Sequence, residues 1–76
     1  MNGLSMGESV SVYKVIEIIG TSTTSWEDAA VTAVTTAGST LRDLRVAEVV
    51  KQDLDLDGEG GPVFRVKLQI SFKYEA

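Results

Sequence analysis

The chain has 76 residues and a formal net charge of −4, and it contains neither Cys nor His. The absence of Cys excludes disulfides, thiolate metal sites and thiol chemistry, and the absence of His removes the commonest general base and metal ligand. The acidic balance argues against nucleic-acid binding, which depends on Lys and Arg, and no apolar run approaches the ~20 residues of a membrane span.

Residues 1–9 lack the basic start and apolar centre of a signal peptide. We interpret them as a flexible N-terminal leader that precedes a single domain over residues 10–76, and we expect a cytoplasmic location. A core of this size supplies only about 3–5 kcal/mol, so small folds add disulfides, a metal or oligomerisation. Without Cys, oligomerisation is the expected support.

The first predicted element is a strand over residues 10–19. Ile16 and Ile18 lie on one face of it, and Val15 and Ile19 lie on the other. A strand covered by one helix would alternate between apolar and polar residues. We therefore expect that something beyond the monomer covers the second face of this strand. Residues 20–24 are predicted to form a turn, because one Gly without a following Lys is a very weak phosphate-loop signal.

A helix is predicted over residues 25–44. Thr24 and Ser25 are both suitable N-caps, residues 24–27 fit a capping box, and Arg42 falls in the last turn, as the helix dipole favours. An apolar stripe has helical spacing and is rich in Ala, so a sheet can approach it closely. It comprises Trp26, Ala29, Ala30, Ala33, Val34, Ala37, Leu41 and Leu44. Residues 29–41 carry no charge, which indicates either a neutral exposed surface or a contact with another subunit.

Two further strands are predicted over residues 45–57 and 63–74, joined by a Gly-rich hairpin loop. A bulge is expected between Val49 and Leu54, where the apolar spacing is odd. The last strand alternates most cleanly between apolar and polar residues. The order is β-α-β-β, and antiparallel pairing then requires strand order 1-3-2. We predict an α+β fold with a three-stranded antiparallel sheet packed on one helix.

Two sets of acidic residues are candidates for chemistry. Asp53, Asp55 and Asp57 begin like an EF-hand loop, but the twelfth position is Phe64, so an exposed strand face is favoured. Glu17 and Glu48 are expected on the sheet face away from the helix, together with Arg65 and Lys67. They are ordinary cross-strand pairs, or they form a cation site if symmetry brings several copies together.

No Ser has a His to activate it, so no catalytic group is identified. Trp26 lies on the helix stripe, where it is interpreted as a core or interface residue.

Four segments together resemble the dodecin family, in the same element order. They are residues 12–22 (VYKVIEIIGTS), 25–30 (SWEDAA), 40–50 (TLRDLRVAEVV) and 64–75 (FRVKLQISFKYE). The resemblance implies a non-enzymatic protein that assembles as a hollow shell of twelve subunits. Flavin-binding dodecins hold pairs of flavins and store or buffer them. In these members a Trp stacks on the flavin, and some members that lack this Trp are associated with calcium.

Two positions that match the family's flavin site are altered. Where flavin-binding members have a Trp that stacks on the flavin, this chain has Val46, and where they have a Gln after the aromatic that opens the last strand, it has Arg65. We therefore predict a dodecin-like homododecameric shell, with its domain over residues 10–76, that binds a small ligand or cation. Flavin is the family ligand and calcium is the other candidate. The alternative is a structural or interaction assembly with no small-molecule role.

Overall fold

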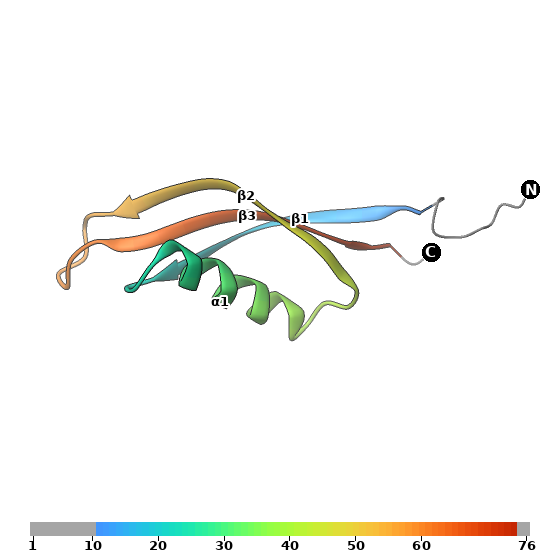
Figure 1. Cartoon of the computed structure of the whole chain (residues 1–76), viewed down its shortest axis with the longest axis horizontal. Coiled ribbons are helices and arrows are strands. Elements are labelled where there is room, and N and C mark those ends of the chain that lie inside the picture. Colours follow the sequence, from blue (N-terminus) through green and yellow to red (C-terminus); the bar gives the residue numbers. More distant parts are fainter. Residues whose placement is uncertain (1–10, 75–76) are drawn as a thin grey trace, which may run out of the picture.

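The computed structural model describes residues 11–74, so the leader predicted over residues 1–9 lies outside the described residues. The elements in chain order are β1 (Tyr13–Ser22), α1 (Trp26–Gly38), β2 (Leu44–Asp55) and β3 (Val63–Lys73). The strands form one antiparallel sheet in the order β1-β3-β2, and α1 lies along one face of it (Figure 1). The predicted fold class and strand order are confirmed. Within residues 11–74, no helix is long and apolar enough to cross a membrane.

Strand β1 ends later in the chain than predicted, at Ser22 instead of residue 19. The predicted turn begins at Gly20, but Gly20 pairs with Val66 and Ser22 pairs with Phe64. Pairing along the whole length of β3 therefore overrides the turn preference of the Gly-Thr-Ser segment. The strand begins at Tyr13 instead of residue 10.

The start of α1 is capped one residue later than the predicted capping box. Ser25 is the N-cap, and its hydroxyl accepts a hydrogen bond from the backbone N–H of Asp28 at 2.9 Å. The carboxylate of Asp28 accepts a hydrogen bond from the Ser22 hydroxyl at 2.7 Å. The end of β1 and the first turn of α1 are thereby tied together.

The predicted end of the helix at Leu44 is wrong, because α1 ends at Gly38. The Ser39 N–H and hydroxyl both bond to the carbonyl of Thr36, and the Leu41 N–H bonds to the carbonyl of Ala37, which terminates the helical pattern. Arg42 consequently lies in the connection to β2 and not in the last helical turn, where there is no basic residue. Leu44 is the first residue of β2, although Leu41 and Leu44 still pack against the core.

The core lies between α1 and the middle of β3. Its buried apolar residues are Ala29, Ala33, Ala37, Val66, Leu68 and Ile70. A side chain at Gly20 would collide with the backbone carbonyl of Ala29, so the bare strand backbone is what allows the helix to come this close. The Ala-rich stripe therefore approaches the sheet closely, as predicted.

Strand β2 contains the predicted bulge, seen as a register shift between Val49 and Lys51, and a second, unpredicted shift between Leu44 and Val46. Large apolar side chains remain exposed on both outer strands, including Val15 (55%) and Ile19 (52%) on β1. Val15 and Ile19 share the face of β1 that is turned away from the helix, whereas Ile16 and Ile18 on its other face pack against the core.

Candidate functional site

The sheet has one face covered by α1 and one face turned away from it, which we call the outer face. Val66, Leu68 and Ile70 of β3 point toward α1. The residues that alternate with them on β3, and the register partners of those residues on β1 and β2, therefore point away from the helix. The outer face carries Glu17, Ile19, Val46, Glu48, Asp53, Arg65, Lys67 and Gln69.

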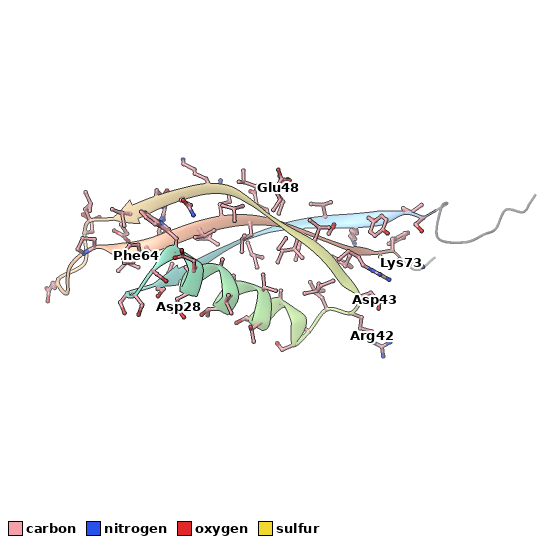
Figure 2. All side chains as sticks on the ribbon, in the orientation of Figure 1. Asp28, Arg42, Asp43, Glu48, Phe64 and Lys73 are labelled. Atoms are coloured by element: carbon pink, nitrogen blue, oxygen red, sulfur yellow. The ribbon has the colours of Figure 1, made fainter. Side chains whose placement is uncertain are left out.

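A row of oxygen-bearing side chains crosses the outer face from edge to edge. Glu17 of β1 and Glu48 of β2 are both register partners of Gln69 on the central strand, and Glu48 lies on the side of β2 away from the helix (Figure 2). Gln69 Nε2 donates to Glu17 Oε2 at 3.4 Å, and Lys67 Nζ lies 4.0 Å from Glu17 Oε1. The two predicted cation ligands therefore share one face with Arg65 and Lys67, as expected from the alternation.

This row is not a complete metal site in one chain. Among residues 11–74, no three acidic side chains come close enough together to hold a metal ion. Calcium takes 6–8 oxygen ligands, far more than two separated carboxylates and one amide supply.

Arg65 forms the shorter of the two ion pairs found among residues 11–74. Its Nε and Nη2 donate to Oδ1 and Oδ2 of Asp53 at 2.8 and 3.0 Å, a two-point ion pair between β3 and β2. These hydrogen bonds lower the pKa of Asp53 and raise the pKa of Arg65, while partial removal from water acts in the opposite direction on both pKa values. The guanidinium is thus already neutralised within its own chain.

The backbone under this ion pair is held from the helix side. The indole Nε1 of Trp26 donates to the backbone carbonyl of Asp53 at 3.1 Å, and the Trp26 ring meets Phe64 edge to face at 5.0 Å. Trp26 therefore joins the start of α1 to β2 as an internal packing residue, in agreement with the core interpretation.

Val46 lies near the opposite end of the outer face from Arg65. It is 62% exposed and pairs with Ser71, whose hydroxyl donates to the Val46 carbonyl at 3.4 Å. Ser71 and Arg65 are six positions apart on β3, or roughly 20 Å along the strand. The structure therefore does not bring the two altered flavin-site positions together within one chain.

Sequence reasoning missed two members of the outer face. Asp53 was grouped with Asp55 and Asp57 as an exposed acidic run, but only Asp53 pairs with Arg65. In the loop that follows β2, the Asp57 N–H donates to Oδ1 of Asp55 at 3.0 Å. Gln69 was not singled out, although its alternation on the last strand already placed it beside Lys67. An acidic residue on the strand beside Arg65 indicates a cross-strand ion pair. The bulge in β2 prevents the sequence from showing which Asp stands opposite Arg65.

The comparisons with known proteins agree with the fold. The family model described as Dodecin matches residues 12–75. The calcium dodecin of Mycobacterium tuberculosis is 55% identical over 64 residues, which cover 84% of this chain and 90% of that protein.

Solved structures give the same result. A crystal structure of that calcium dodecin, described as calcium chelating with a novel calcium-binding site, has 54% identity and a TM-score of 0.77, and the match covers 86% of this chain and 93% of that one. The dodecin of Streptomyces coelicolor has 33% identity and a TM-score of 0.81, covering 90% and 97% of the two chains. By sequence, element order and sheet topology, this chain belongs to the dodecin family.

Proposed function

We propose that this chain is the non-enzymatic subunit of a closed homododecamer that binds and stores a small cation, with calcium as the first candidate. The observation that carries the proposal is the row formed by Glu17, Gln69 and Glu48 across the outer face. The relative from M. tuberculosis is itself called a calcium dodecin.

The exposed apolar surface supports assembly. Val15 and Ile19 on β1 and Val49 and Val50 on β2 are about half exposed, so both outer strands present apolar surface to water. The helix adds Val31, 64% exposed, on a face without charge. A second copy of the chain would remove these side chains from water, and the hydrophobic effect would then supply the stability that the small core lacks.

Assembly would also complete the cation site. One chain presents two carboxylates and the Gln69 amide, and within the described residues 11–74 no three acidic side chains converge. Symmetry-related copies of Glu17 or Glu48 meeting at an axis would bring enough oxygens to one point for a hard cation. The site would then exist only in the oligomer.

The same face argues against flavin as the ligand. Val46 offers a small aliphatic surface where a stacking Trp would present a broad ring, and aromatic pairing is worth about 0.5–1.5 kcal/mol beyond the buried area. Arg65 only donates hydrogen bonds, whereas a Gln at this position would also accept them. Two of the Arg65 donors already bind Asp53. We therefore expect weak or absent flavin binding.

Calorimetric titration of EDTA-treated protein with calcium tests the proposal. Wild type should bind calcium, and Glu17→Gln should lose at least about tenfold in affinity, because a ligand carboxylate is removed. Asp55→Asn is the matched control, since it removes the same charge from an exposed residue after the bulge, and it should bind as wild type does.

Two results would contradict the proposal. If Asp55→Asn weakens binding more than Glu17→Gln, the acidic hairpin and not the outer face holds the ion. If an assembled wild-type protein gives no heat with calcium at millimolar concentration, the alternative of a structural or interaction assembly without a small-molecule role replaces it. Light scattering on the same samples shows whether the assembly is present.

A further inference from the structure

Two lysines stand directly opposite each other on the outer face. Lys51 of β2 is the register partner of Lys67 on β3, two positions along β3 from Gln69 and the proposed cation row. Like charges placed opposite each other on one face of a sheet destabilise the strand pairing. The two side chains border a small hollow, which we call the lysine hollow. It is lined by Ile19, Lys51, Asp53, Arg65 and Lys67.

The lysine hollow has an excess of positive charge. Its lining carries three cations and one carboxylate, and this carboxylate of Asp53 already binds Arg65. Within residues 11–74, the other ion pair joins Lys67 to Glu17 at 4.0 Å, and Lys51 takes part in neither pair. The pKa of Asp53 is lowered first by its hydrogen bonds from Arg65 and further by the charges of the two lysines, so both ammonium groups act on this hollow.

The size of the lysine hollow restricts the ligand that it could hold. Its volume is about 90 Å³. One water molecule takes up about 30 Å³ in the liquid, so the hollow has room for a group of the size of a few water molecules. Sites that enclose cofactors or other drug-sized molecules have about 300–1,000 Å³, so this hollow is too small to enclose a flavin or a nucleotide.

We propose that the lysine hollow binds a small tetrahedral dianion of the phosphate and sulfate class, and that this anion and the cation of the neighbouring row favour each other's binding. Each ammonium group offers three donors, and charge-assisted hydrogen bonds to such oxygens are strong. Arg65 has five N–H donors, of which two bind Asp53, so it can also donate to the anion.

The link between the two sites is Lys67, which lines the lysine hollow and also contacts Glu17 of the cation row. An anion in the hollow would draw the Lys67 ammonium toward itself and leave the Glu17 carboxylate free for a cation. A cation on Glu17 would release Lys67 in the same way. Coupling between two binding sites is reciprocal, so each ligand should raise the affinity of the other by the same factor. This coupling rests on the proposed function, whereas anion binding by the hollow does not.

The probe is sulfate, which stays dianionic near neutral pH, titrated calorimetrically into assembled, EDTA-treated protein without divalent ions. Lys51→Gln should weaken sulfate binding by at least about fivefold, because one charge-assisted contact is lost. The variant should fold and assemble normally, since Lys51 is exposed and its loss relieves a like-charge pair. Lys67→Gln should weaken sulfate binding in the same direction from β3.

The matched control is Arg45→Gln, which removes one positive charge from an exposed residue of β2 outside the lysine hollow. It should change sulfate affinity less than twofold. Equal affinities in Lys51→Gln and Arg45→Gln would overturn the proposal, because sulfate would then respond to net charge alone or bind elsewhere. Absence of sulfate binding to wild type at millimolar concentration would also overturn it.

Calcium titrations with and without saturating sulfate, at one ionic strength kept constant with NaCl, test the coupling. Sulfate should raise the calcium affinity of wild type at least about threefold and should have less effect in Lys51→Gln. An unchanged or lower calcium affinity in wild type would overturn the coupling. If calcium does not bind under either condition, the proposed function fails, and the sulfate titrations of Lys51→Gln and Arg45→Gln still decide whether the hollow binds an anion.

Discussion

Replacing Gly20 by Ala tests whether the close approach of α1 to β1 holds the fold together. A Cβ at this position would lie 2.8 Å from the Ala33 Cβ and 3.2 Å from the carbonyl carbon of Ala29, and closer still to the Ala29 carbonyl oxygen. Carbon atoms pack best at about 3.5–4.0 Å, so the helix would have to move outward by roughly 1 Å. The obstacle is helix backbone and not a flexible side chain, which leaves no local way to relieve it.

The expected loss is large relative to the stability of the domain. Overpacking of a well-packed core typically destabilises by about 1–3 kcal/mol, against the ~3–5 kcal/mol that a single core of this size supplies. Each kcal/mol shifts Tm by roughly 4–8 °C in a domain of this length, so we expect Tm to fall by about 4–24 °C. Thermal melts followed by circular dichroism at one fixed protein concentration measure the shift, because assembly makes Tm concentration-dependent.

Gly60→Ala is the matched control for this experiment. It introduces the same methyl group in the hairpin loop, where a Cβ would meet no atom within 4 Å. Its free energy of unfolding should stay within about 0.5 kcal/mol of wild type, as is usual for surface substitutions. A Gly20→Ala protein that melts together with Gly60→Ala would refute the reasoning, because the helix would then have room that the geometry denies it.

Three further perturbations follow from the helix face and the outer face. Thr36→Lys places a charge on the uncharged side of α1 and should weaken assembly measured by light scattering. Val46→Trp combined with Arg65→Gln should restore quenching of riboflavin fluorescence, which the natural sequence should lack at submicromolar concentration. The pKa of Asp53 lies below its usual 3.8 in the folded protein, so its pairing stabilises the fold above that pH and is lost as the pH falls through the lowered value. The urea concentration at half-unfolding, measured between pH 5 and 2, should therefore fall less with decreasing pH in Asp53→Asn than in wild type.

Each of these has a result that counts against it. Thr23→Lys adds the same charge in the β1–α1 connection and should leave the oligomer intact, so equal disruption by both variants would reject a specific helix interface. Failure of the double variant to quench riboflavin would mean that the shape of the pocket differs as well as these two positions. An unchanged acid profile in Asp53→Asn would show that other carboxylates control unfolding at low pH.

The sequence predicted the fold well because its strongest patterns are local. The alternation in the last strand identified the central strand and both of its faces, and the Ala-rich stripe identified the face of α1 that meets the sheet. The end of the helix was misplaced because Leu41 and Leu44 continue the helical spacing by coincidence. Their apolar side chains reach the same core from the connection and from β2.

The outer face was only partly predictable, because it depends on register between strands that are distant in sequence. Glu17 and Glu48 could be assigned to one face by alternation alone. The partner of Arg65 could not be identified in this way, because the register shift between Val49 and Lys51 decides which of the following aspartates stands opposite Arg65. The separation between Val46 and Arg65 along β3 likewise needed the register.

The bond from Trp26 to the carbonyl of Asp53 gives the protein a built-in optical reporter. The chain has a single Trp, so its emission spectrum has one source. That indole is hydrogen-bonded to the backbone directly beneath the Arg65–Asp53 pair and packs against Phe64. Separation of the start of α1 from β2 would expose the ring to water and shift its emission to longer wavelength. Events on the outer face that move the Asp53 backbone can therefore be followed in the unlabelled protein, in real time and at low concentration.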